Sequence, residues 1–285
     1  MAEFFGFEVR LKKRSHFRRL ASSPILSASA MVHVGATTAT VIQPGIWPWA
    51  VGAVIANHAV LTAAGLWPRS RWLGPNWITL PSASAARGEV AITIDDGPDP
   101  AVTPRVLAQL AQFGATATFF CVGQRVRRYP DLAREILRQG HDIENHSQRH
   151  RHDFSLLGPK RMHREIAEAQ DSIANVTGSI PGFFRAPAGL RNPFLQPVLD
   201  DLQLRLASWT RRGFDTINGN PDVIYKRLVT SLQGGDILLL HDANAARNLA
   251  QLPVILDVLP RILETLRSRR LVPVTLRAAL DDSRA

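Results

Sequence analysis

A run of 48 residues, over positions 20–67, contains no Asp, Glu, Lys or Arg, and this gap restricts the possible folds more than any other feature of the sequence. A Gln-Pro-Gly turn at 43–45 divides the run into two apolar stretches, about 24–42 and 47–67. Each stretch is close to the roughly 20 residues that a helix needs to cross a bilayer, and Trp residues bound the second one, as is common at a membrane interface. The run therefore predicts a helical hairpin whose apolar surface must be buried, in a membrane or against another part of the protein.

Three interpretations of this run remain open. A transmembrane or re-entrant hairpin is favoured, because six Arg and Lys residues between positions 10 and 19 precede the run. The alternatives are two buried helices packed on the main domain, and a cleaved signal peptide, for which Ser-Ala-Ser-Ala at 27–30 resembles a cleavage site. The predicted organisation is a basic tail over 1–19, a membrane-associated hairpin over 20–67, a linker rich in Pro, Ser, Ala and Arg over 68–88, and a main domain over 89–285.

The distribution of charge points to a membrane surface and away from nucleic acid. The formal net charge is +10, but residues 1–87 hold nine Arg and Lys against two Glu, which accounts for +7 of it. The remaining residues carry only +3, an ordinary value for a soluble domain. The 45% hydrophobic content allows a sizeable core, and the single cysteine excludes both a disulfide framework and a thiolate zinc cluster.

From residue 89 onward, short apolar runs alternate with helical patterns. This alternation indicates a parallel sheet, and seven units in about 200 residues favour a closed or partly closed barrel. No phosphate-binding glycine fingerprint follows the first strand, which weakens the case for a nucleotide-binding fold. The predicted strands are 90–95, 116–122, 142–145, 182–186, 204–209, 236–241 and 271–276, and the predicted helices lie near 103–113, 130–139, 160–175, 195–202, 221–232 and 251–268.

Polar residues follow several of these strands at their carboxyl ends, where parallel barrels collect catalytic groups. Asp95 and Asp96 precede a Gly-Pro break, and two adjacent Asp side chains can share a site only where a strand turns. His146 and His150 lie four positions apart, so on one helical turn both imidazoles can bind one metal ion. Two imidazoles and a carboxylate would form a three-ligand set that activates water, although each motif alone also suits an ordinary turn or exposed polar side chains.

Two further strand ends carry basic groups. Arg185 ends the fourth predicted strand, where its guanidinium can brace a carboxylate through two hydrogen bonds, although a surface arginine beside a turn is the simpler alternative. His241 ends a run of apolar residues typical of a buried parallel strand, where a lone histidine is more often a core residue. Both residues are expected on the same rim as the Asp pair.

Taken in order, Asp-Asp-Gly-Pro, His-x3-His, Arg-x-Pro-x-Gly and Leu-Leu-His-Asp resemble the signature motifs of the polysaccharide deacetylase family, the NodB-homology group of carbohydrate esterase 4. The resemblance covers about residues 88–285. It implies an α/β fold, a distorted (β/α)7 barrel behind the N-terminal apolar helical hairpin, and hydrolysis of an N-acyl group from an amino sugar. It also implies Asp95 as general base, Arg185 as the residue that orients it, and His241 as general acid. One divalent ion, usually zinc, would be held by Asp96, His146 and His150.

The resemblance further implies a substrate pocket formed by Pro187, Trp209, Asp215 and Leu239, with Leu239 beside the acyl methyl group. The chain departs from the family pattern in two places. Ala188 stands where an aromatic residue usually precedes the glycine of the third motif, so the floor of the pocket is expected to differ. The stretch 209–215 retains only a Trp and an Asp of a motif that usually places Asp residues beside a Trp, and Asp215 is expected to tune His241.

Two rival functions remain open, a metal-dependent phosphoesterase and a catalytically silent carbohydrate-binding barrel. The expected partners are an N-acylated amino sugar, in a polysaccharide or a lipid-linked glycan, and a membrane contacted through residues 20–67; no nucleic acid is expected. Release of acetate from an N-acetylated sugar oligomer, with and without chelator, separates the three functions.

The flanking charges also predict which side of the inner membrane the barrel faces. Basic residues lie on both sides of the apolar run, with Arg69, Arg71 and Arg87 after it, and the turn has none. The positive-inside tendency then places both ends of the hairpin, and the barrel, in the cytoplasm. His33 and Gly35 weaken the first stretch, and if only the second one spans, the barrel faces outward.

Overall fold

The computed structural model describes residues 23–281, so the basic tail predicted over residues 1–19 lies outside the described part of the chain. The chain divides after Asn57 into two compact units. This boundary falls inside the second apolar helix, whereas the sequence predicts it at the end of that helix.

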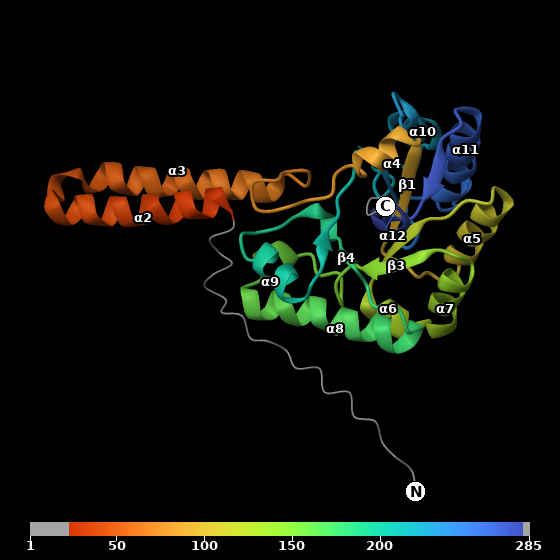
Figure 1. Cartoon of the computed structure of the whole chain (residues 1–285), viewed down its shortest axis with the longest axis horizontal. Coiled ribbons are helices and arrows are strands. Elements are labelled where there is room, and N and C mark those ends of the chain that lie inside the picture. Colours follow the sequence, from red (N-terminus) through yellow and green to blue (C-terminus); the bar gives the residue numbers. More distant parts are fainter. Residues whose placement is uncertain (1–22, 282–285) are drawn as a thin grey trace, which may run out of the picture. The chain divides into compact units, whose positions relative to one another are not determined.

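The apolar run forms two helices, α2 (Pro24–Ile42) and α3 (Trp47–Leu66), joined by a single 3-10 turn, η1 (Pro44–Ile46) (Figure 1). The side chain of Asn57 on α3 donates a hydrogen bond to Ser29 Oγ on α2 at 2.8 Å. Both helices are long and apolar enough to cross a membrane. Their exposed apolar side chains include Met31, Val34, Val41, Ile42, Trp47, Trp49 and Ile55.

A curled parallel sheet forms the centre of the second unit. Its strands follow the order β5-β4-β3-β2-β1-β7-β6, and β8 pairs with the first half of β1. The two edge strands, β5 and β6, follow each other in the chain, so residues 207–210 connect the edges directly. The strands are β1 (Glu89–Asp95), β2 (Thr118–Cys121), β3 (Asp142–Asn145), β4 (Phe183–Phe184), β5 (Arg205–Leu206), β6 (Arg211–Arg212), β7 (Ile237–His241) and β8 (Val272–Val274).

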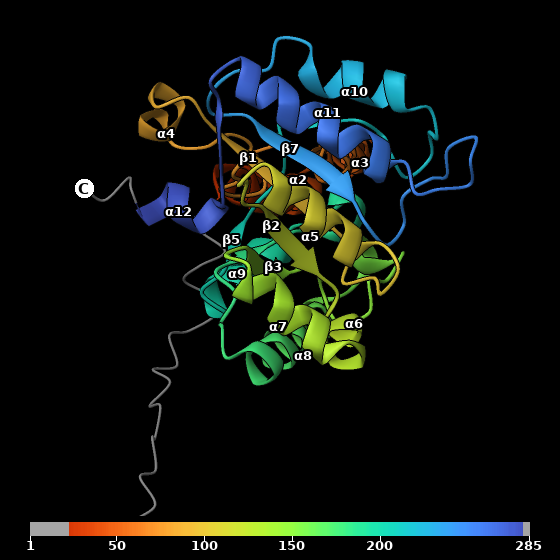
Figure 2. The ribbon, with the colours of Figure 1, turned by 90° about the vertical axis from the view of Figure 1, so that its right-hand side faces the viewer.

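Helices flank this sheet; in Figure 2, β1, β2 and β7 lie among α5, α7 and α11. Four helices carry a proline in their first turn, where the missing N–H breaks no helical hydrogen bond. The parallel, partly closed arrangement of strands and helices confirms the predicted distorted (β/α)7 fold. The helices are α5 (Thr103–Gln112), α6 (Gly123–Arg128), α7 (Pro130–Arg138), α8 (Pro159–Thr177), α9 (Leu195–Asp201), α10 (Pro221–Val229) and α11 (Ile255–Ser268).

The structure contains elements that the sequence analysis missed: β6, α6, α4 (Ser82–Ala86) and α12 (Leu276–Asp281). Helix α4 lies in the segment 68–88, which composition suggested as a linker. This segment packs on the barrel, because Leu73 and Leu80 are buried and the Trp77 ring meets Phe183 edge-on, with centroids 5.1 Å apart. A few apolar side chains among many Pro, Ser and Ala residues are enough to hold it there.

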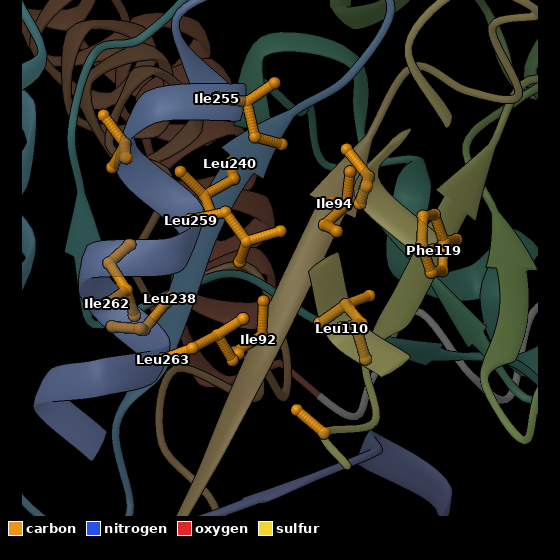
Figure 3. Packing of buried hydrophobic residues seen from close by; sticks show 14 of the residues in the cluster. Ile92, Ile94, Leu110, Phe119, Leu238, Leu240, Ile255, Leu259, Ile262 and Leu263 are labelled. Carbon is orange, nitrogen blue, oxygen red and sulfur yellow. The ribbon is translucent and has the colours of Figure 1, made fainter. Parts of the chain in front are cut away.

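The main core lies between β1, β7 and the helices α5 and α11 (Figure 3). Ile92 and Ile94 of β1 point into this core, where they pack among Leu240 of β7 and Leu259 of α11. Because successive strand side chains point to opposite faces, Asp95 belongs to the inner face of the sheet. The hydrophobic pattern of β1 therefore fixes the side of the sheet on which the acidic pair begins.

Candidate active site

The acidic pair lies where β1 gives way to a turn. Asp95 is the last residue of the strand, and Asp96 adopts a positive φ of 79°, so the chain changes direction between the two carboxylates. Both side chains are buried and line one pocket. Gly97 is needed next in the chain, since a Cβ there would lie 2.6 Å from the Asp242 carboxylate.

Asp96, His146 and His150 converge as a candidate metal centre. Asp96 Oδ1 lies 3.3 Å from His146 Nε2 and 3.1 Å from His150 Nε2. This buried oxygen has no hydrogen-bond partner among the described residues, although Oδ2 accepts a hydrogen bond from Asn244 Nδ2 at 2.9 Å. The three ligand atoms lie within 4.8 Å of one another, so a single divalent ion fits between them.

The protonation of this cluster suits a metal ligand set. His146 Nδ1 lies 2.9 Å from the carbonyl oxygen of Arg185, to which it donates, and this leaves the Nε2 lone pair facing Asp96. Burial raises the pKa of Asp96, but the positive charge that His146, His241 and His150 carry when protonated holds the pKa of that carboxyl well below its usual range. The oxygen that faces both imidazoles is therefore ionised.

The segment that carries the two histidines is not helical, so the helical-turn reasoning behind their spacing is wrong. Ser147 and His150 adopt positive φ values of 64° and 49°. The His150 N–H donates to Ser147 Oγ at 3.1 Å, and the Gln148 N–H donates to the Glu165 carbonyl at 2.9 Å. An irregular loop, held by α8, brings the two imidazoles together.

Arg185 supports Asp95 from inside the barrel. One guanidinium nitrogen, Nη1, donates to Asp95 Oδ1 and to Thr93 Oγ1, both at 2.7 Å. The other nitrogens donate to the carbonyls of Ala207 at 3.2 Å and Ser208 at 2.8 Å. The predicted contact is present, but Asp95 receives one hydrogen bond rather than two, because other donors of Arg185 are used at Thr93, Ala207 and Ser208.

His241 and Asp215 form a second buried ion pair. His241 Nδ1 lies 2.9 Å from Asp215 Oδ1, and the backbone N–H of His241 donates to Asp215 Oδ2 at 2.8 Å. Burial lowers the pKa of His241, but the charge and hydrogen bond of Asp215, with Asp95 and Asp96, raise it to about 9. The contact expected between the two residues is therefore present.

One pocket of about 470 Å³ collects most of the predicted residues. Its lining includes Asp95, Asp96, His146, His150, Trp209, Leu239 and His241. Pro187, Asp215 and Arg185 do not line it: each is buried, and Arg185 contacts Asp95 while Asp215 contacts His241. Sequence reasoning missed Asn244, which follows the last motif, and Arg212, which lies in the divergent stretch 209–215 and reaches the rim through the pairing of β6 with β7.

Comparisons with known proteins agree with the fold and the motifs. A family model for polysaccharide deacetylases matches residues 83–207. The peptidoglycan-N-acetylglucosamine deacetylase of Bacillus cereus is 35% identical over 161 residues, which cover 56% of this chain and 75% of that protein. The chitooligosaccharide deacetylase of Sinorhizobium fredii is 32% identical, covering 58% of this chain and 76% of that protein.

Solved structures show the same similarity. A family 4 carbohydrate esterase from Streptomyces lividans has 33% identity and a TM-score of 0.59, covering 65% of this chain and 91% of that one. A carbohydrate esterase family 4 pseudoenzyme from Bacillus anthracis, 21% identical with a TM-score of 0.62 over 69% of this chain and 66% of that one, shares the fold. On its motifs, its fold and its relatives, this chain belongs to the polysaccharide deacetylase family, carbohydrate esterase family 4.

Proposed function

We propose that this protein hydrolyses an N-acyl group, acetyl in the simplest case, from an amino sugar in a polysaccharide or a lipid-linked glycan. One observation carries the proposal: a buried carboxylate oxygen of Asp96, without a hydrogen-bond partner in the described chain, faces two imidazole nitrogens in the same pocket as Asp95 and His241. The relatives named as deacetylases of peptidoglycan and chitooligosaccharides support this class of substrate.

We assign Asp96, His146 and His150 as the ligands of one divalent ion, which we take to be zinc. Nitrogen and carboxylate ligands in this number suit a catalytic site that keeps positions open. When bound, the ion supplies Lewis acidity, which polarises the acyl carbonyl and lowers the pKa of the attacking water. Asn244 would hold the Asp96 carboxylate in its ligating orientation.

Asp95 is assigned as the general base. Its Oδ1 accepts the hydrogen bond from Arg185, and its Oδ2 lies 3.9 Å from His146 Nε2, toward the metal ligands. The hydrogen bond from the Arg185 guanidinium fixes the orientation of the Asp95 carboxylate. Asp95 can therefore accept a proton from the water that attacks the acyl carbon.

His241 is assigned as the general acid. Its Nδ1 is engaged with Asp215, so Nε2 is the nitrogen left to protonate the departing amine. This step is required because an amide anion is not a viable leaving group near neutral pH. The raised pKa of about 9 favours the protonated imidazole that the step needs. Leu239, two residues before His241 on β7 and therefore on the same face of the sheet, lines the pocket and is assigned to the acyl methyl group.

The decisive experiment is acetate release from an N-acetylated sugar oligomer by the purified full-length protein, with chelator and after zinc is restored. We expect turnover that the chelator removes and zinc restores. Asp95→Asn and His241→Ala should each abolish turnover while elemental analysis still finds metal. Phosphate-ester hydrolysis without acetate release would favour the phosphoesterase alternative, and sugar binding without either reaction would favour the silent barrel.

We also propose that α2 and α3 hold the protein at the inner membrane, with the barrel in the cytoplasm. The length and apolar composition of both helices support association with lipid. Reporter fusions after Leu66 and at the C-terminus test the orientation. A cytoplasmic reporter signal is expected at both positions, and alkaline phosphatase activity there would contradict the hairpin topology.

A further inference from the structure

A second pocket, of about 680 Å³, adjoins the active-site pocket and shares Ala188, Trp209 and Arg212 with it. We call it the arginine pocket. Its lining contains four arginines and no acidic residue. The arginines are Arg69, Arg211, Arg212 and Arg227, and the large apolar side chains are Leu66, Trp67, Leu190, Trp209 and Phe214.

The four arginines differ in their contacts with carboxylates among the described residues. Arg211 pairs with Asp236 at 2.5 Å. Within residues 23–281, by contrast, no carboxylate forms an ion pair with Arg69, Arg212 or Arg227. Three guanidinium groups that share one pocket repel one another, and an anion between them would remove this cost.

Arg212 is the residue best placed to bind such an anion, because it lines both pockets. Its guanidinium lies 4.9 Å from the centroid of the Phe214 ring and 5.4 Å from that of Trp209. Its buried Nε has no hydrogen-bond partner in the part of the chain that the structure describes. The guanidinium therefore lies beside two aromatic rings, and its Nε–H donor is unused within the described residues.

The other two arginines that line the active-site pocket have carboxylate neighbours. Arg125 lies 3.5 Å from Asp99, and Arg149 pairs with Glu165 at 2.6 Å and Glu168 at 3.1 Å. Those arginines are neutralised by neighbouring carboxylates. Of the three arginines that line the active-site pocket, Arg212 is thus the one that no carboxylate of the described residues neutralises.

We propose that the substrate is an N-acylated amino sugar joined through a phosphate or diphosphate to a lipid chain, an inference that rests on the deacylase function proposed above. The acyl sugar occupies the active-site pocket, and its phosphoryl oxygens bind Arg212 and the arginines beside it. Guanidinium groups suit this task because their N–H fork matches the geometry of a phosphate. The single methyl group of Ala188 leaves room where the two pockets meet.

The apolar wall of the arginine pocket provides the place for the lipid. Trp67 and Phe214 are 56% and 40% exposed, and Leu66 ends the apolar helix α3. An alkyl chain that leaves the phosphate can cover these side chains, which a water-soluble sugar phosphate would leave exposed. Contact between the lipid chain and these apolar side chains should therefore make the lipid-linked substrate bind better than a free sugar phosphate.

The test compares three substrates of the metal-loaded, full-length protein in detergent. They are decyl N-acetylglucosaminyl phosphodiester, the decyl glycoside of N-acetylglucosamine without the phosphate, and N-acetylglucosamine 1-phosphate without the lipid. We expect kcat/KM for acetate release to be at least about ten-fold higher for the first than for either of the others, the size of effect that a charged hydrogen bond supplies. Arg212→Gln should reduce the preference for the phosphodiester over the glycoside by about ten-fold.

Two further variants test whether the effect comes from the arginine pocket and not from the loss of any positive charge. Arg227→Gln removes an exposed charge from the arginine pocket and should lower the same ratio without unfolding the chain. Arg205→Gln removes an equal, exposed charge at the start of β5, at the other end of the sheet, and should leave the ratio unchanged. Equal rates for the phosphodiester and the glycoside, or a ratio that neither pocket variant lowers, would overturn the inference and leave the deacylase function intact.

Binding of decyl phosphate, measured by calorimetry on the same preparations, distinguishes the two proposals. If no substrate releases acetate but Arg212→Gln still weakens decyl phosphate binding by about ten-fold, the deacylase function fails and the anion site stands. If acetate is released but decyl phosphate binds the wild type and Arg212→Gln equally, the anion site fails.

Discussion

Replacing Asp215 by Asn should move the pH dependence of the reaction while leaving the shape of the site intact. Asn retains an oxygen for the backbone N–H of His241 but removes the charge that lies 2.9 Å from Nδ1. Burial lowers the pKa of His241, and the Asp215 charge is the first of the opposing effects that raise it to about 9. Without that charge, only Asp95 and Asp96 oppose the effect of burial, and the pKa should fall toward the ordinary value of 6.5.

The size of the effect follows from these two values. A full return of the pKa from about 9 to 6.5 corresponds to about 3 kcal/mol of lost stabilisation of the imidazolium. At pH 8, about 90% of the imidazole is protonated with the higher pKa and about 3% with the lower one. Because the general acid must be protonated, Asp215→Asn should lower kcat by about thirty-fold at pH 8 and by much less at pH 6.

The assay is acetate release between pH 5 and 10, followed as the alkaline limb of the kcat profile. Asp236→Asn is the matched control, since Asp236 is also buried and ion-paired but lies at the other end of β7, against Arg211. The control should lower stability without moving the alkaline limb. If the limb of Asp215→Asn coincides with that of the wild type while the protein remains folded, Asp215 does not set the protonation of His241.

Further perturbations test other parts of the structure. The His146→Ala, His150→Ala double variant should lose its metal in elemental analysis, and stoichiometric metal there would contradict the ligand assignment. Burial lowers the pKa of His141 to about 4, so on acidification the unfolded chain takes up this proton before the folded one. The free energy of unfolding should therefore fall by up to about 3 kcal/mol as the pH drops from 6.5 through 4. His141→Phe should remove this pH dependence in denaturant titrations. Leu240→Ala, at a fully buried position of β7, should cost about 2–5 kcal/mol in the same measurement, and a smaller loss would mean that the core closes around the cavity. Ala188→Tyr should narrow the junction of the two pockets and lower kcat/KM for the phosphodiester substrate by more than for N-acetylglucosamine 1-phosphate.

The catalytic rim could be predicted where a strand pattern is strong. Asp95 and His241 end runs of buried apolar residues, and the carboxyl ends of parallel strands share one edge, so their proximity follows from the sequence. The convergence of His146 and His150 was also correct, but the helical argument for it was not, because positive φ values in the loop leave no periodic signal.

Elements held by tertiary contacts were less accessible to sequence reasoning. Strand β6 consists of Arg211 and Arg212, which have no strand pattern of their own and are extended because they pair with Leu238 and Leu239 of β7. Arg212 therefore reaches the rim through a register that only the folded sheet defines. Helix α6 is short, begins with glycine and has too few apolar residues to show a helical period.

The segment that connects the two edge strands makes the position of the proposed general base depend on the local stability of the sheet. Residues 207–210 bridge β5 and β6, and the carbonyls of Ala207 and Ser208 in this bridge hold the guanidinium of Arg185. Arg185 in turn holds Asp95. A local unfolding of residues 207–210 would release Arg185 and leave the Asp95 carboxylate without its positive neighbour, even while the core around Ile92 and Leu240 remained folded. Amide hydrogen exchange at Ala207 and Ser208 would then report the fraction of molecules in which Arg185 no longer contacts Asp95. On heating, the enzyme would lose activity at a lower temperature than that at which the core unfolds.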